Sequence, residues 1–463
     1  MVRTLDRILR KFSRKDAKVQ RKILGPFADF APLPLRDNFS NDLMSFSSHV
    51  AWTFATRLLM IGNSVVAGVI VARWLGADGV GQLAVINVAV ATIVQLGSFG
   101  LPSANGYFIA QDHARFRSAT VNSLIFALAA GSLLALGLSA LASLRPDWFG
   151  FVSPELICIA AISIPFQLLA LIGLNILLAV GKIKEFNLLD LAGQSFVLIN
   201  AVLVLIVLHR GLELLVTLNT TAAILVSIAV ASLLVISAKS VARSEWRADM
   251  ALLRRMIAYG IKFHVSILAN AIILRADLLV VNHFRGAAEA GVYSVASQFG
   301  LLLMLLPGVI ATLLFPRVTA EQDARGETTC LVTRYTTFVM FLCCLAAVPF
   351  SLLLPVLYGA AFSGATTLLL ILLPGVYLIG LESVLVQHFN ALGLPRAIPM
   401  YWVATLVLNL ILVFALVPRF GAHGAAIAST ISYAAIFAFV ALHFHTSTGR
   451  SFSEVFVLGS LRG

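Results

Sequence analysis

Long apolar stretches dominate this chain and alternate with short polar interruptions. The interruptions are mostly under a dozen residues long and contain glycine, proline and charged side chains. Each apolar stretch offers the roughly 20 residues that a helix needs to cross the hydrocarbon core of a bilayer. We predict twelve membrane-spanning helices, at 48–72, 81–107, 118–143, 154–180, 186–208, 213–237, 256–283, 291–315, 331–357, 365–391, 397–417 and 423–444.

The composition agrees with a membrane protein and excludes an ordinary soluble one. Apolar residues make up 60% of the 463 residues and charged residues only 12%, whereas soluble domains carry about 25% charged residues. The net charge of +12 lies in short loops between apolar runs, so we expect membrane lipid as a partner and no nucleic acid. The chain has four cysteines, which show neither metal-ligand spacing nor a disulfide framework: Cys158, Cys330, Cys343 and Cys344.

The basic residues predict the orientation in the membrane. The first 46 residues contain ten of them and no apolar core of a signal peptide. With both termini on one side, 25 lysines and arginines lie on that side and five on the other. Because cytoplasmic loops carry the excess of positive charge, we expect both termini in the cytoplasm. The expected domains are a basic tail (1–46), two six-helix bundles (47–240 and 241–446) and a C-terminal tail (447–463).

An internal repeat supports this division into halves. Six spans in each half give both halves the same orientation, and two such bundles around a cleft suit alternating access. The alternative is that glycine-rich turns recur by chance. Four pairs of markers lie 209 to 212 residues apart, namely Gly81 with Gly291, Gly181 with Gly393, Asn200 with Asn409, and Gly211 with Gly421.

Three segments carry a family resemblance that covers about residues 45–445. They are ARWLGADGVGQLAV (72–85), LRADLLVVNHFRGAAEAGVYSVASQF (274–299) and NALGLPRAIPMYWVATLVLNLILVFALVPRFGAHGAAIASTISY (390–433). The chain resembles the polysaccharide-flippase branch of the multidrug/oligosaccharidyl-lipid/polysaccharide exporter superfamily. Val80 replaces the aromatic residue that is usual in the first segment.

The resemblance implies an all-α, V-shaped fold of the multidrug-exporter (MATE) type in a bacterial inner membrane. It implies a flippase for polyprenyl-diphosphate-linked oligosaccharides in O-antigen, capsule or exopolysaccharide assembly. A polysaccharide polymerase and a chain-length regulator are the implied protein partners. The lipid II flippase branch fits less well because it typically has two further helices.

Two other functions remain open on sequence alone. The multidrug branch shares the fold and couples export to cations through a different set of acidic residues. A membrane polymerase or glycosyltransferase generally needs a large outer loop or an acidic pair, and the predicted outer loops are short and lack one. Nucleotide-binding, metallohydrolase and serine-hydrolase motifs are also missing. We therefore expect a transporter and not an enzyme, without a cofactor or a metal.

Arg57 is the clearest candidate for substrate binding. Ionisable groups at bilayer depth are costly and usually face a cavity or a partner. A helix turns about 100° per residue, so Arg57 shares a polar stripe with His49, Thr53 and Ser64. Such a stripe is expected to line the cavity, where a guanidinium can hold a diphosphate in bidentate geometry. The alternative is a hydrogen bond between helices.

The seventh predicted span is polar on two sides. Lys262 and Arg275 join Arg57 as predicted ligands of the diphosphate, and His264 and Asn270 are predicted to line the cavity. Asp277 is either a structural partner or a coupling residue. The alternative places the charged groups near the two membrane interfaces, within reach of snorkelling.

Glu382 lies in the middle of the tenth span and is the main candidate for cation or proton coupling. A lone buried carboxyl group can carry a proton. The alternative is a carboxyl group hydrogen-bonded across a helix interface. Asp190, near the end of the fifth span, is expected at the membrane interface.

Overall fold

The computed structural model describes residues 39–241, 245–321, 323–393 and 395–457. It divides into two units, Met1–Phe54 and Ala55–Gly463, and the arrangement described below is that of the second unit. The described residues form helices and no strands. Ten of their helical segments are long and apolar enough to cross a membrane, as expected for a multi-pass membrane protein.

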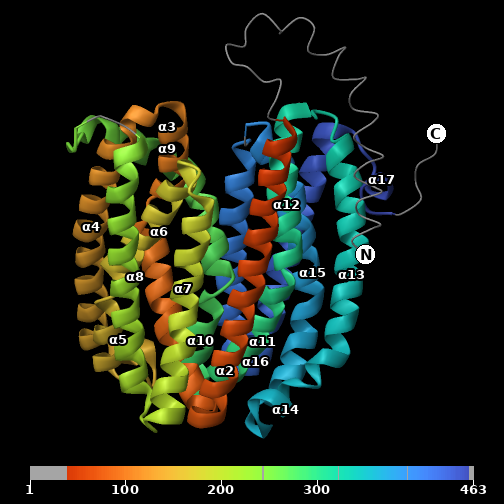
Figure 1. Ribbon diagram of the computed structural model, residues 1–463. Helices are drawn as coiled ribbons and strands as arrows, with labels where there is room; N and C mark the ends of the chain where they lie inside the picture. Colours follow the sequence, from red (N-terminus) through yellow and green to blue (C-terminus); the bar gives the residue numbers. More distant parts are fainter. Residues whose placement is uncertain (1–38, 242–244, 322, 394, 458–463) are drawn as a thin grey trace, which may run out of the picture. The chain divides into compact units, whose positions relative to one another are not determined.

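The helices of the second unit run side by side and are connected by short loops (Figure 1). Those of the first half are α2 (Phe39–Gly97, which begins in the first unit), α3 (Leu101–Gln111), α4 (Phe116–Leu144), α5 (Pro154–Ala161), α6 (Ile164–Ala179), α7 (Ile183–Ala201) and α8 (Leu212–Val241). Short helical turns are η2 (His113–Arg115), η3 (Pro146–Phe149) and η4 (Val202–Val207).

The second half has the same character. Its helices are α9 (Met250–Ile273), α10 (Ala276–Arg285), α11 (Ala287–Leu303), α12 (Leu305–Glu321), α13 (Glu327–Ser351), α14 (Leu354–Tyr358), η5 (Ala360–Phe362), α15 (Gly364–Ala391), α16 (Ala397–Thr448) and α17 (Phe452–Phe456).

Two glycines explain why ten long segments stand where twelve spans are predicted. The long helix α2 contains Gly76 with a φ of 65°, and α16 contains Gly421 with a φ of 58°. An α-helix does not tolerate these angles, and glycine adopts them because it has no Cβ. Each glycine therefore marks a kink between two helices, and the kink falls between two of the predicted spans.

One apolar helix lies at the centre of each half. In the first half α6 packs against α3, α4 and α8, and in the second half α15 packs against α11, α12, α13 and α16. Both sequences are apolar around the whole helix, the pattern of a helix covered on all sides. Gly131 and Gly173 allow close packing on α6, because a Cβ on them would lie 2.4 Å from Pro165 Cα and 2.6 Å from Val230 Cγ1.

The two halves meet where α3 contacts α9. Gly100 has a φ of 72°, and a Cβ on it would lie 2.3 Å from the carbonyl oxygen of Gly260. The rings of Tyr107 and Tyr259 stack beside this contact with centroids 4.3 Å apart. Backbone packing of this kind requires small residues on both helices.

Candidate functional site

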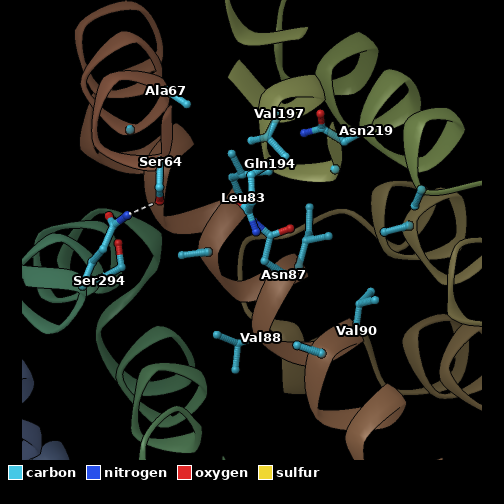
Figure 2. A pocket seen from close by; sticks show the side chains of 18 of the residues that line it. Ser64, Ala67, Leu83, Asn87, Val88, Val90, Gln194, Val197, Asn219 and Ser294 are labelled. Atoms are coloured by element: carbon cyan, nitrogen blue, oxygen red, sulfur yellow. Dashed lines mark hydrogen bonds between the residues drawn. The ribbon is translucent and has the colours of Figure 1, made fainter. Parts of the chain in front are cut away.

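A cavity of about 680 Å³ lies between helices of both halves. Its walls come from α2, α6, α7 and α8 on one side, and from residues 274–301 and Tyr358 on the other. Figure 2 shows Ser64, Asn87, Gln194, Asn219 and Ser294 around this space. The size suits a small polar head group rather than a protein segment.

Amide side chains dominate the polar part of the lining. Gln298 donates a hydrogen bond of 2.9 Å to Ser64, which is drawn dashed in Figure 2. Asn219 accepts one of 3.0 Å from Asn200. Asn87 and Gln194 are exposed to the cavity and form no hydrogen bond with another described residue. Their amides can therefore donate to and accept from a ligand.

Arg275 is the arginine that lines the cavity. It precedes α10, its side chain is exposed, and no described residue forms an ion pair or hydrogen bond with it. A guanidinium in this position offers five N–H donors to an anionic group. The contact of Arg275 with a phosphate stays a prediction.

Asp277, two residues further on, has a different environment. Its carboxylate accepts hydrogen bonds from the Tyr293 hydroxyl, from Ser429 Oγ at 2.7 Å and from the Leu278 backbone N–H at 2.8 Å. Its side chain is buried. A carboxylate with these donors joins α10 to α11 and α16, which favours the structural role.

Arg57 lies next to the cavity and is bound to a carboxylate. Its guanidinium forms an ion pair of 2.9 Å with Asp190 and lies 6.0 Å from the centroid of the Phe186 ring. Asp190 lines the cavity, whereas Arg57 is outside the lining. The structure thus brings Arg275 and the Arg57–Asp190 pair to one region. The side chain of Lys262 lies outside the described residues.

The predicted polar lining is only partly found in this cavity. Ser64 lines it. His264 is buried instead, with its ring stacked 6.3 Å from that of Phe99, and Asn270 is also outside the lining. Thr53 belongs to the first unit, and the side chain of His49 lies outside the described residues.

Glu382 lies on α15, away from this cavity. Its side chain is only 2% exposed, and its Oε1 atom has no hydrogen-bond partner among the described residues. The described residues therefore show no hydrogen bond from Glu382 across a helix interface, and its coupling role stays a prediction.

The cavity ends against a backbone contact between the halves. A Cβ on Gly81 would lie 1.7 Å from the carbonyl oxygen of Ala287, and one on Gly291 would lie 2.0 Å from that of Ala77. Val80, the neighbour of Gly81, lines the cavity. We call this end of the second unit, which contains residues 73–81, 147–151, 283–291 and 356–358, the Gly76 end.

Two side-chain contacts flank the paired glycines. Arg73 Nε donates to the carbonyl oxygen of Leu357 at 2.9 Å, and His283 Nδ1 donates to that of Asp147 at 3.0 Å. The two donor residues, Arg73 and His283, lie 210 residues apart in the sequence, and so do the two acceptor residues, Asp147 and Leu357. Gly81 and Gly291 have the same spacing. The contact is therefore made of equivalent positions from the two halves.

Two neighbouring interactions strengthen this end. Asn282 Nδ2 donates to the carbonyl oxygen of Phe149 at 2.8 Å. A hydrogen bond from Arg145 lowers the pKa of the exposed Asp147 carboxyl. Asp147 consequently stays ionised in neutral water while its carbonyl oxygen binds His283.

Sequence reasoning missed several residues of this site. Asp190 was expected at the membrane interface, and the structure adds that it lines the cavity and pairs with Arg57. The signal that could have found this pair was the presence of two opposite charges in different predicted spans. Asn87 and Gln194 gave no signal, because single amides occur on many helices of this chain. Arg73 and His283 are signalled by the repeat, since they occupy equivalent positions.

Comparisons with known proteins agree with this architecture. Residues 70–367 match the model of a family described as "Polysaccharide biosynthesis protein". The succinoglycan biosynthesis transport protein ExoT of Rhizobium meliloti (strain 1021) is 25% identical over 302 residues, which are 63% of this chain and 58% of that protein. The chain thus spans somewhat more than half the length of this curated relative.

Two solved structures have a similar fold. The lipid II flippase MurJ in an inward closed conformation gives a TM-score of 0.70 at 17% identity, over 85% of this chain and 87% of that one. An inward-facing multidrug MATE transporter gives 0.66 at 16% identity, over 87% and 99%. The predicted all-helical fold of the exporter superfamily is confirmed. The family description and the relative named as a transport protein agree with the prediction of a transporter rather than an enzyme.

Proposed function

Because the chain belongs to the polysaccharide biosynthesis protein family, we propose that it is a flippase for lipid-linked glycans. The substrate of this proposal is a polyprenyl-diphosphate-linked oligosaccharide, which crosses a bacterial inner membrane for assembly of a surface polysaccharide. The family match, the relative named as a transport protein and the fold support this proposal. Polymerases and chain-length regulators of the same assembly are its expected partners.

One observation carries the substrate assignment, namely the free guanidinium of Arg275 in a cavity between the halves. A diphosphate is a bidentate anion that matches the planar fork of a guanidinium. The polyprenyl tail stays in the bilayer while the head group occupies the cavity. Arg57 is the second ligand in this scheme, after Asp190 releases it, and Lys262 is the third.

The Gly76 end is the outer end in the predicted orientation. The head group enters from the cytoplasmic side while the contact of Gly81 with Ala287 is closed. Rocking of the halves then parts this contact and releases the head group outward. Protonation of Glu382 is the proposed coupling step.

The competing function is a cation-coupled multidrug exporter with the same fold. A cationic drug requires an uncompensated carboxylate in the cavity. Here Asp190 is paired with Arg57 and Asp277 is buried among its donors. The described lining therefore favours an anionic head group over a cationic one.

The experiment is a leaflet-transfer assay with the purified full chain in lipid vesicles. The probe is a fluorescent undecaprenyl-diphosphate-linked N-acetylglucosamine oligomer. We expect transfer by the protein and little transfer by Arg275→Ala. Absence of transfer, together with uptake of a cationic dye such as rhodamine 6G, would replace this function by drug export.

A further inference from the structure

The cavity presents more neutral hydrogen-bonding groups than charges. Five amides belong to its lining: Asn87, Gln167, Gln194, Asn219 and Gln298. Three of them form hydrogen bonds within the protein, which fixes their direction, as for Gln167 with Ser163 at 2.8 Å. The other two, Asn87 and Gln194, are exposed to the cavity and keep their full capacity to donate and accept.

The two free amides project from two different helices of the first half toward the same space. Asn87 lies on α2, ten residues beyond Ala77 of the closed end, and Gln194 lies on α7. Figure 2 shows both side chains directed into the space between these helices. A hydroxyl or acetamido group between them can accept from one amide and donate to the other.

The charged residues that face this space offer no unpaired cation to a second anionic group. Arg275 is the cation of the described lining, and the diphosphate uses it in the proposed function. Arg57 is paired with Asp190 and is the second ligand of the diphosphate in the proposed function, so neither arginine is left for a sugar carboxylate. The remaining lining carboxylate, Asp277, is already hydrogen-bonded. A sugar carboxylate would leave water, approach Asp190 and find no guanidinium in exchange, which makes its burial unfavourable.

We infer that Asn87 and Gln194 form a glycan subsite that selects an uncharged sugar next to the diphosphate. This inference rests on the proposed function and specifies its substrate class. The sugar is held by neutral hydrogen bonds, and a uronic acid at the same position is disfavoured because its carboxylate would lose water without gaining a guanidinium in exchange. Amides suit this task because they are uncharged and can both donate hydrogen bonds to sugar hydroxyl groups and accept them.

The test compares three probes in equilibrium binding to the purified full chain. They are bare undecaprenyl diphosphate, the same lipid with a neutral N-acetylglucosamine oligomer, and the oligomer with its first sugar oxidised to a uronate. We expect the neutral glycolipid to bind at least about tenfold more tightly than the uronate. Asn87→Ala and Gln194→Ala should each weaken only the neutral glycolipid, by about fivefold for one lost neutral hydrogen bond.

Two further variants make the test specific. Gln194→Lys adds a cation to the subsite and should shift the preference toward the uronate. Gln111→Ala removes an exposed amide outside the cavity and should bind all three probes as the parent does.

The outcomes separate this inference from the proposed function. Equal binding of uronate and neutral glycolipid, or unchanged binding by both alanine variants, overturns the subsite while the diphosphate proposal stands. Failure of all three lipids to bind overturns the proposed function itself.

Discussion

The contact of Gly81 with Ala287 offers a direct test of closure at the Gly76 end. In Gly81→Ala the new Cβ would lie 1.7 Å from the Ala287 carbonyl oxygen, about half of the ~3.3 Å that carbon and oxygen normally keep. Both groups belong to helix backbones, so no side chain can move aside. Overpacking of this kind costs about 1–3 kcal/mol, and it destabilises only the closed state.

This free energy shifts the ratio of closed to open states by about five- to 150-fold. The assay measures labelling of Gln194→Cys in the cavity by a membrane-impermeant maleimide added at the Gly76 end, with the four native cysteines replaced. We expect Gly81→Ala to label at least about fivefold faster than the Gln194→Cys parent, and Gly81→Ala in the otherwise unchanged chain to export less glycan. Gly291→Ala should act in the same way, because its Cβ would lie 2.0 Å from the Ala77 carbonyl oxygen.

Gly62→Ala is the matched control, since nothing lies within 4 Å of the added Cβ in the same helix. It should label and export as the parent does. Parental labelling and export by Gly81→Ala would refute the idea that this contact closes the cavity.

Three other residues give shorter tests. Arg275→Ala should weaken binding of undecaprenyl diphosphate by about ten- to a hundredfold, the worth of a charged hydrogen bond, with normal membrane levels in immunoblots; unchanged binding would remove Arg275 from the site. Asp277→Ala leaves the Tyr293 and Ser429 hydroxyls unpaired and should lower the free energy of unfolding by about 1–3 kcal/mol, measured by thermal denaturation in detergent, while an unchanged midpoint would contradict the structural role. Glu382→Gln should make vesicle transfer insensitive to an imposed pH gradient, and retained stimulation would exclude Glu382 from coupling.

The fold was accessible from the sequence because it depends on features that repeat along the chain. Apolar length predicts each spanning helix without any knowledge of its neighbours. Gly76 and Gly421 were visible as interruptions between spans, and the structure shows a kink between two helices at each of them. Each kink depends on the backbone dihedral angles of one glycine.

The site was less accessible because it depends on how the helices are rotated and paired. Arg57 was predicted to line the cavity and lies outside the lining, because it pairs with Asp190, which is 133 residues away on another helix. His264 shows the reverse case, since it was expected in the cavity and is buried against Phe99. Helical periodicity indicates which residues share a face, but not what that face meets.

Deletion of the gene in its host tests the central claim of glycolipid flipping most directly. The measurement is mass spectrometry of undecaprenyl-diphosphate-linked oligosaccharides, together with analysis of surface polysaccharide. The proposed function predicts loss of one surface polysaccharide and accumulation of its lipid-linked repeat on the cytoplasmic face, both reversed by the parent gene. Normal surface polysaccharide without accumulation, accompanied by sensitivity to cationic drugs, would contradict it.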